Sequence, residues 1–337
     1  MVAGAQVASI KGMEAVYELP LAPRGLVFLA HGCQHSALDF WPYSTSCAKC
    51  IGLPEEVRVT NAILTQDWGA IALSAADRGL YRCWNFESDA GSVVKVLAAF
   101  RQVHRLSHLP LAALGVSSGG AFVLQLARRI PLSAIVCQVM AIPPSYYVGF
   151  QGARFPPTLF IHMFRDQRTA MLVRRSILRL NQTGVRTGEI VAPPLKITPG
   201  YFCRVPRMNM ALAAQLHRIL APILDANGCL QGDPRETEWR QLLVGSDVAA
   251  HLPGTRPDRI DTLEPDVSPL AEILNVAWAE HEITSEYMRD TMRWISYAGN
   301  AFSNGGAYGG NDIDSVEDIV TMQSTRCTAV AKEAQVC

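Results

Sequence analysis

The sequence predicts an α/β protein built on one doubly wound, mostly parallel sheet, with a helical excursion after the last strand. Two observations carry this prediction. Continuous apolar runs of strand length recur along roughly the first 200 residues, as is typical of strands that helices cover on both faces. Segments with helical character separate these runs at short spacing, which is typical of βαβ units and therefore of parallel pairing. With 337 residues, 49% of them hydrophobic, the chain can bury a large core.

Each core element has its own local signal. Residues 6–10 and 13–19 flank Lys11-Gly12 and are expected to form an opening hairpin. The helix expected at 54–66 has a proline and two glutamates in its first turn. Buried strands are expected at 25–30, 70–75, 111–114, 133–141, 158–163 and 189–198, and further helices at 88–104, 121–130 and 167–181.

Beyond residue 200 the alternation ends. Residues 208–227 and 269–297 have helical patterns, and a connector rich in proline, aspartate and glycine joins them. Residues 300–311 have the composition of a flexible linker. We therefore expect one domain over residues 1–298 followed by a flexible tail at 299–337. Within the domain, the core lies at about 24–198 and the helical excursion at about 200–298.

Composition narrows the classes of partner. Lysine plus arginine equals aspartate plus glutamate at 30 each, and no basic run occurs, which argues against nucleic acid or an anionic membrane as a partner. No apolar stretch approaches the roughly 18–20 residues that span a bilayer, and the N-terminus lacks a basic region followed by an apolar core. We expect a cytoplasmic protein that uses no cofactor. The sequence leaves a divergent organelle-targeting peptide open, and it does not indicate an oligomeric state.

The stretch Leu111–Val123 predicts a nucleophilic serine. It reads as a strand, a sharp turn and a helix, with Gly115-x-Ser117-x-Gly119 at the turn. Glycines two positions before and after such a serine remove Cβ atoms that would clash with the neighbouring strand and helix. Ser118 is the weaker nucleophile candidate because Val116 occupies the position of its first glycine. A turn that merely caps a helix is the alternative.

Three features together resemble the α/β-hydrolase superfamily over roughly Arg24 to Thr198. They are the His31-Gly32 turn after the first core strand, the glycine–serine pattern at Ser117, and Asp166 after the run TLFIHMFR. The longer strings HGCQHSALDFWP, CAKCIGLPEEVR and LNVAWAEHEITSE are similar to those of a hydrolase-like group of proteins from photosynthetic eukaryotes. That narrower resemblance implies no substrate.

The resemblance implies a catalytic triad in the chain order Ser, Asp, His. Ser117 is then the nucleophile and Asp166 the acid, although Asp166 could instead only cap the helix that starts at Gln167. The superfamily usually places its histidine just after the last strand, where this chain has none. His281 is the preferred base because of the string around it, and His251 is the alternative base. His281 follows Asp166 by 115 residues, so the excursion would have to return to the sheet edge.

The same resemblance implies an oxyanion hole made by the backbone N–H groups of Cys33 and Ser118. His31 is expected to order its loop. The function expected from these residues is that of a serine hydrolase acting on a small-molecule carboxylic ester through an acyl-enzyme. A non-catalytic binding module with the same fold remains an alternative, as does an acyltransferase or peptidase that uses the same triad.

Two further groups of residues leave their roles open. The cysteines Cys33, Cys47, Cys50 and Cys83 could form disulfides, remain free thiols or bind zinc; because only one pair is cleanly spaced for zinc, no metal site is predicted. Aromatic residues of two early loops either line an apolar acyl pocket or pack those loops; these are Phe40, Trp41, Tyr43, Tyr81, Trp84 and Phe86. If the late helices form a lid, a bulky or hydrophobic ester is favoured.

Overall fold

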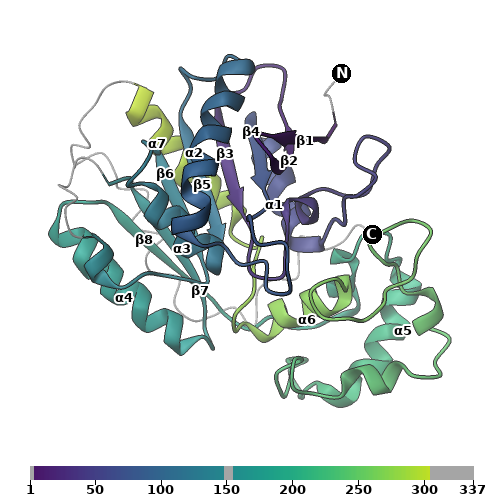
Figure 1. The fold of residues 1–337 in the computed structure, drawn as a ribbon. Helices are drawn as coiled ribbons and strands as arrows, with labels where there is room; N and C mark the ends of the chain where they lie inside the picture. Colours follow the sequence, from purple (N-terminus) through teal and green to yellow (C-terminus); the bar gives the residue numbers. More distant parts are fainter. Residues whose placement is uncertain (1–3, 148–154, 304–337) are drawn as a thin grey trace.

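The computed structural model describes residues 4–147 and 155–303 (Figure 1). Its centre is an eight-stranded sheet in the order β1-β2-β4-β3-β5-β6-β7-β8. The first two strands form an antiparallel hairpin that pairs antiparallel with β4, and the remaining strands are parallel to one another. The strands are β1 (Gln6–Ile10), β2 (Met13–Glu18), β3 (Gly25–Ala30), β4 (Trp68–Leu73), β5 (Leu111–Val116), β6 (Ala134–Gln138), β7 (Thr158–Met163) and β8 (Thr187–Ala192).

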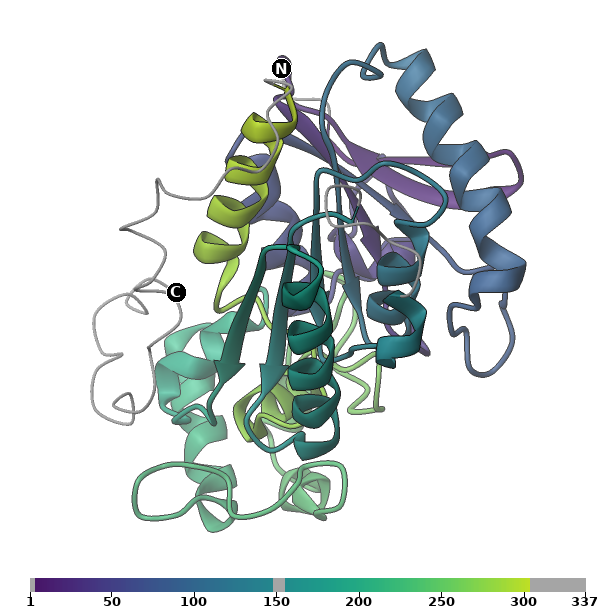
Figure 2. The same ribbon diagram turned by 90° about the vertical axis from the view of Figure 1, so that its left-hand side faces the viewer.

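Helices cover both faces of this sheet, as Figure 2 shows. α1 (Pro54–Leu64) and α7 (Met288–Ser303) pack on one face, where their apolar side chains join one buried cluster with the strands. On the opposite face lie α2 (Phe86–Val103), α3 (Ser118–Leu126) and α4 (Gln167–Gln182), with a second cluster. Strands β3 to β7 are buried along their whole length, which explains why their sequences are almost entirely apolar.

The predicted core elements are all present, with small shifts at their ends. The strand expected at 70–75 begins earlier, at Trp68, and the strand expected at 189–198 ends at Ala192. Pro193 and Pro194 follow it directly, and proline cannot donate a hydrogen bond to the sheet. The doubly wound, mostly parallel α/β class is confirmed.

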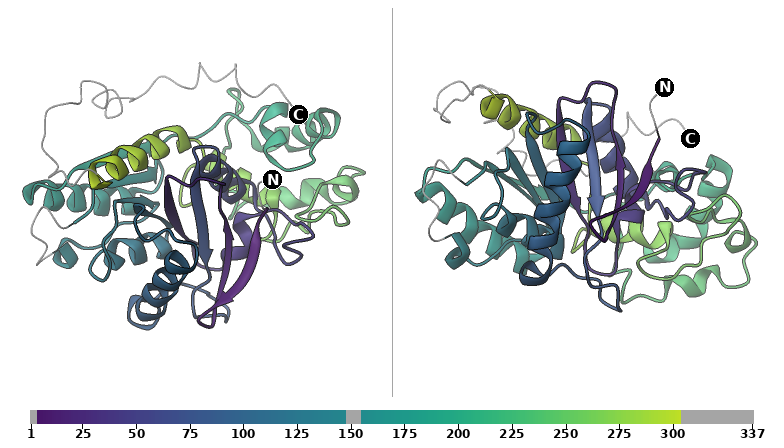
Figure 3. Two further views of the ribbon diagram at one scale, coloured as in Figure 1. Left: turned by 90° about the horizontal axis from the view of Figure 1, so that it is seen from above. Right: turned by 45° about the horizontal axis from the view of Figure 1, so that its top comes forward.

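The helical excursion occupies residues 199–278 and lies beyond the edge of the sheet where the parallel strands end (Figures 1 and 3). It contains α5 (Met210–Leu220), α6 (Pro269–Trp278) and several 3₁₀ turns. These elements pack around a hydrophobic cluster of their own, in which Trp239 and Phe202 are fully buried. The helix predicted at 208–227 is shorter than expected. α5 ends at Leu220, and a 3₁₀ turn follows it as far as Ile223.

The single helical segment predicted at 269–297 is wrong. α6 ends at Trp278, because Ala279 adopts a left-handed backbone conformation with φ of 59°, and α7 begins only at Met288. α7 then returns to the sheet, where Trp294 and Ile295 are buried, rather than belonging to the excursion. It also continues to Ser303, past the expected domain end at 298. The rest of the predicted tail lies outside the described residues.

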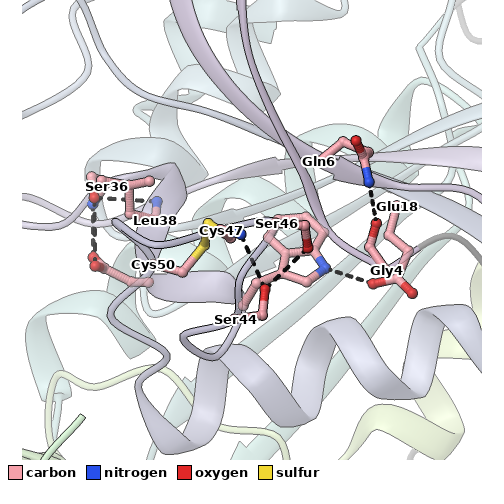
Figure 4. The surroundings of a disulfide bond; sticks show 11 residues. Gly4, Gln6, Glu18, Ser36, Leu38, Ser44, Ser46, Cys47 and Cys50 are labelled. Atoms are coloured by element: carbon pink, nitrogen blue, oxygen red, sulfur yellow. Dashed lines mark hydrogen bonds between the residues drawn. A yellow bond between two sulfur atoms is a disulfide. The ribbon is translucent and has the colours of Figure 1, made fainter. Parts of the chain in front are cut away.

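Four of the early cysteines form two disulfides, Cys33–Cys83 and Cys47–Cys50. Figure 4 shows the second, in the loop between β3 and α1, where the Ser44 hydroxyl accepts a hydrogen bond from the Cys47 backbone N–H at 3.1 Å. Both disulfides consume the thiolates that zinc would need. Across residues 4–147 and 155–303, no three histidine, cysteine or acidic side chains are arranged to hold a metal ion. In the same ranges, no helix has the length and apolar character needed to cross a bilayer.

Candidate active site

Ser117 stands at the sharp turn between β5 and α3, in a strained backbone conformation with φ of 50° and ψ of −116°. The two flanking glycines make this turn possible. A Cβ atom on Gly115 would lie 2.2 Å from the carbonyl oxygen of Gly119, and a Cβ atom on Gly119 would lie 2.2 Å from the carbonyl oxygen of Ala30. Any larger residue at either position would displace backbone.

The structure brings Ser117, His281 and Asp166 together. The Ser117 Oγ atom lies 2.9 Å from Nε2 of His281, and Nδ1 of His281 lies 2.7 Å from Oδ2 of Asp166. Asp166 follows β7 at the carboxyl edge of the sheet. Its second oxygen, Oδ1, accepts a hydrogen bond from the Thr169 backbone N–H, so Asp166 caps α4 and also contacts the histidine.

Hydrogen bonding keeps Asp166 ionised. Burial by itself would raise the pKa of this carboxyl, but the hydrogen bonds from His281 and Thr169 outweigh burial and lower the pKa to about 2. Asp166 is therefore a carboxylate at neutral pH. A carboxylate at this position favours the tautomer of His281 that carries its proton on Nδ1, which leaves Nε2 free to accept a proton from Ser117.

His281 reaches the serine because it lies in a loop between α6 and α7, residues 279–287, which we call the His281 loop. Two buried side chains from other elements hold this loop. Gln138, at the end of β6, donates from Nε2 to the Thr284 carbonyl at 3.1 Å and accepts from the Thr284 N–H at 2.9 Å. The Glu55 carboxylate accepts hydrogen bonds from the N–H and the hydroxyl of Ser285, at 2.7 and 2.8 Å.

Gln138 also contacts the turn at residues 115–119 that carries Ser117, which we call the serine turn, because its backbone carbonyl accepts a hydrogen bond from the Ser117 N–H at 3.0 Å. One residue thereby positions both the serine and the loop that carries the histidine. Sequence reasoning missed this role. The available signal was a glutamine inside an apolar strand, which is fully buried here and needs partners for its amide.

The sequence also did not reveal that Glu55 holds the His281 loop, because two glutamates in a first helical turn are a common signal of a helix start. The Arg204 guanidinium, which comes from the excursion, lies 2.6 Å from the Glu55 carboxylate and also pairs with Glu286. Burial would raise the pKa of Glu55, but Arg204 and the Ser285 N–H outweigh burial and hold it below its usual value. The excursion, α1 and the His281 loop therefore meet at one buried, ionised carboxylate.

The predicted oxyanion donors lie beside Ser117. Cys33 and Ser118 both have backbone N–H groups with no acceptor among the described residues. The disulfide joins the Cys33 loop to Cys83, and the next residue, Trp84, donates its N–H to the Ser118 hydroxyl at 3.3 Å. The loops that carry the two donors are thus connected to each other.

His31 orders its loop, as expected. Its ring is 1% exposed, and Nε2 accepts a hydrogen bond from the Ala75 N–H at 3.1 Å. Nδ1 therefore carries the proton and donates to the Gly32 carbonyl at 2.6 Å. Burial lowers the pKa of His31 to about 4, so the ring is neutral. Both ring nitrogens are already engaged in hydrogen bonds.

The structure does not bring the alternative base to the serine. His251 is exposed in a 3₁₀ turn of the excursion, where Nδ1 contacts the Asp247 carbonyl at 2.6 Å. His217 lies in the middle of α5. Histidine at position 281, not 251, is the one within hydrogen-bond distance of Ser117.

A cavity of about 220 Å³ lies beside Ser117 and His281. Besides these residues and Gly32-Cys33, charged and ionisable side chains form much of its wall; these are His35, Glu56, Arg235, Asp266 and Glu282. None of the six early aromatic residues lines it. Trp41 is buried and donates to Glu18, and Trp84 stacks on Phe122, so these two tryptophans pack the loops, whereas Tyr81 is exposed.

Comparisons with known proteins give similarity in structure only. No protein-family model matches the chain, and no curated protein sequence is significantly similar to it. Three solved structures illustrate the similarity. TT1662 of Thermus thermophilus is 16% identical, with a TM-score of 0.39, over 58% of this chain and 90% of that chain. The α/β hydrolase enzyme MGS-M1, from a Medee basin deep-sea metagenome library, is 13% identical, with a TM-score of 0.43, over 61% and 90%.

The third structure, carboxyl esterase 2 of the mycorrhizal fungus Tuber melanosporum, is 13% identical, with a TM-score of 0.39, over 56% of this chain and 76% of that chain. The strand order, the helices on both faces and the strained serine turn after the central strand β5 define the α/β-hydrolase fold. The chain has this fold.

Proposed function

We propose that this protein is a serine hydrolase that cleaves a carboxylic ester through an acyl-enzyme. Ser117 is the nucleophile, His281 the general base and Asp166 the residue that orients the histidine. The observation that carries the proposal is the distance of 2.9 Å between Ser117 Oγ and His281 Nε2, at a strained turn.

In the first step, His281 Nε2 takes the proton of the Ser117 hydroxyl as Oγ attacks the ester carbonyl carbon. The imidazolium that forms is stabilised by the ionised Asp166, which accepts the hydrogen bond from Nδ1. The same proton then passes to the leaving alcohol, the C–O bond breaks, and the acyl group remains on Ser117. Water, activated by His281, releases the acid and restores the serine.

The negative charge on the tetrahedral oxygen needs fixed donors. The N–H groups of Cys33 and Ser118 supply them in this proposal, and the N-terminal end of α3 adds a favourable dipole. The Cys33–Cys83 disulfide and the hydrogen bond from Trp84 to Ser118 support the proposal because they restrict both donors before substrate arrives.

The alternatives differ in what they would do with the serine. The binding-module alternative depended on a displaced histidine, and the contact between His281 and Ser117 supports catalysis instead. An acyltransferase or a peptidase would use the same three residues with a different acceptor or substrate. The two disulfides favour an oxidising compartment over the cytoplasmic location that the sequence suggested.

Labelling with a fluorophosphonate probe tests the proposal directly. Wild-type protein is expected to be labelled at Ser117. Ser117→Ala is expected to lose labelling, and its turnover number on esters is expected to fall by about 10⁴–10⁶-fold. His281→Ala should lose labelling as well, whereas His251→Ala should match the wild type. Folded wild-type protein that resists the probe would contradict the proposal and favour the binding module.

A further inference from the structure

The cavity beside Ser117 is small. Pockets for drug-sized ligands span roughly 300–1,000 Å³, whereas this cavity measures about 220 Å³. Its apolar wall is limited to Val116, Val139 and Ile283. A long alkyl chain would find neither the space nor the apolar surface that its burial requires. The size and lining therefore indicate a short, hydrophilic group.

Most of the charged groups in the wall already have partners. Arg235 donates to the His281 carbonyl at 2.8 Å and to the Glu282 carboxylate at 3.2 Å. Glu282 also accepts from the Asn275 amide and from the Ile283 N–H. His35 contacts Asp39 through Nδ1 at 3.2 Å. These groups shape the cavity, and their hydrogen bonds within the protein leave them less available to a ligand.

Glu56 differs from them. It is 3% exposed, and its Oε2 atom has no hydrogen-bond partner among the described residues. Its Oε1 atom lies 3.8 Å from Nδ1 of His35, which is an ion-pair distance rather than a hydrogen bond. Burial raises the pKa of the Glu56 carboxyl to about 7, so its carboxylate form predominates above that pH. Burial and Glu56 also raise the pKa of the neighbouring Glu272 well above its usual value. A carboxylate accepts up to about four hydrogen bonds, so capacity remains.

The donor that fits Glu56 is a neutral hydroxyl. Asp39 and Glu56 outweigh the effect of burial and raise the pKa of His35 to about 10, so His35 is a cation at neutral pH. A positive charge therefore already stands beside the Glu56 carboxyl, and Arg235 adds a second one to the wall. An ammonium group would meet these two cations, whereas a hydroxyl donates a hydrogen bond without adding charge.

We propose that this cavity binds a short hydroxylated group of the substrate and that Glu56 determines specificity by accepting a hydrogen bond from its hydroxyl. The inference rests on the proposed ester hydrolysis and adds the substrate class, which is a small hydrophilic ester. It differs from the bulky or hydrophobic ester that a helical lid would favour. The excursion does contribute to the cavity, but through the polar residues Arg235 and Asp266.

Matched pairs of esters test this proposal. We would measure kcat/KM for methyl 3-hydroxybutyrate and methyl butyrate, and for p-nitrophenyl acetate, butyrate and octanoate. The wild type should favour the hydroxylated ester by about tenfold or more, as expected for a hydrogen bond to a charged group, and should cleave the octanoate at least about tenfold less well than the acetate. Glu56→Met should reduce the preference for the hydroxyl to about onefold. Glu87→Gln, an exposed acid at the start of α2, should retain it.

The outcomes separate the two proposals. A wild type that prefers the octanoate, or a folded Glu56→Met variant that keeps the preference for the hydroxylated ester, overturns the specificity role while ester hydrolysis stands. If Glu56→Met does not fold, Glu56→Gln supplies the same test, with a smaller expected fall in the preference because the amide oxygen still accepts. If the wild type cleaves none of the five esters and Ser117 resists a fluorophosphonate, the proposed function and this inference fail together.

Discussion

The serine turn and the His281 loop reach the same point in space by different physical means. The turn lies within the contiguous stretch 111–123, and steric exclusion by its own glycines permits its shape. The His281 loop depends on distant residues. Gln138 is 146 residues from its partner Thr284, and Glu55 is 230 residues from Ser285. A local conformation is therefore encoded in a short pattern, whereas the position of a loop is encoded in partners that no short pattern contains.

The two regions also fail differently when they are altered. A larger side chain in the turn collides with backbone, which cannot move without disturbing β3. Removing an anchor of the loop leaves buried polar groups without partners, which costs free energy and lets the loop move. Substitutions in each region can separate these two effects.

The largest loss is expected from Gly119→Ala. The added Cβ atom would lie 2.2 Å from the Ala30 carbonyl oxygen, so the free energy of unfolding should fall by more than about 3 kcal/mol. Gly91→Ala is the matched control, because Gly91 lies inside α2 with open space around it and alanine there should raise stability by about 0.5–1 kcal/mol. Chemical denaturation measures both. Equal stability of the two variants would show that the turn is not sterically fixed.

A loss of activity is expected from Gln138→Leu. Both hydrogen bonds to Thr284 disappear while the fold retains its apolar packing, so His281 should shift relative to Ser117 and the rate of fluorophosphonate labelling should fall by about 10²-fold. Gln138→Glu still accepts from the Thr284 N–H and should restore part of the rate. Gln102→Leu, at an exposed position on α2, serves as the control. A folded Gln138→Leu variant labelled within twofold of the wild-type rate would refute this positioning role.

A smaller and pH-dependent effect is expected from Glu55→Gln. Removing the charge weakens the contacts with Arg204 and Ser285, which should cost about 2 kcal/mol of unfolding free energy at pH 7. The folded-state pKa of Glu55 lies below its usual value of about 4.5, so its stabilisation is present above that pH and is lost as the pH falls through the lower folded value. The difference between wild type and variant should therefore shrink in acid.

Denaturation curves from about pH 7 to pH 3 measure this dependence. The penalty of Gly119→Ala should stay constant over the same range, because no titratable group takes part in that clash. A difference between wild type and Glu55→Gln that persists unchanged in acid would show that the charge of Glu55 does not hold the His281 loop.

The sequence by itself determined what depends on neighbours along the chain. Nearly continuous apolar runs identified the buried strands, because both faces of a central strand are covered and the alternation of polar and apolar residues disappears. The spacing of Gly115, Ser117 and Gly119 identified the strained turn, because only glycine fits where backbone approaches that closely. Asp166 lies three residues after a buried strand, and the resemblance to the superfamily implied its role as the acid.

The tertiary structure decided what depends on remote partners. Ala279 interrupts a segment of continuous helical character, and this break turns the chain so that His281 lies at the carboxyl edge of the sheet. Residues of the helix α1, the strand β6 and the excursion hold that loop, and α1 and the excursion also contribute polar residues to the cavity wall. The sequence likewise did not predict that Cys33 forms a disulfide with Cys83. Hydrogen bonds and charges between distant residues have no fixed sequence spacing, so only the folded chain reveals them.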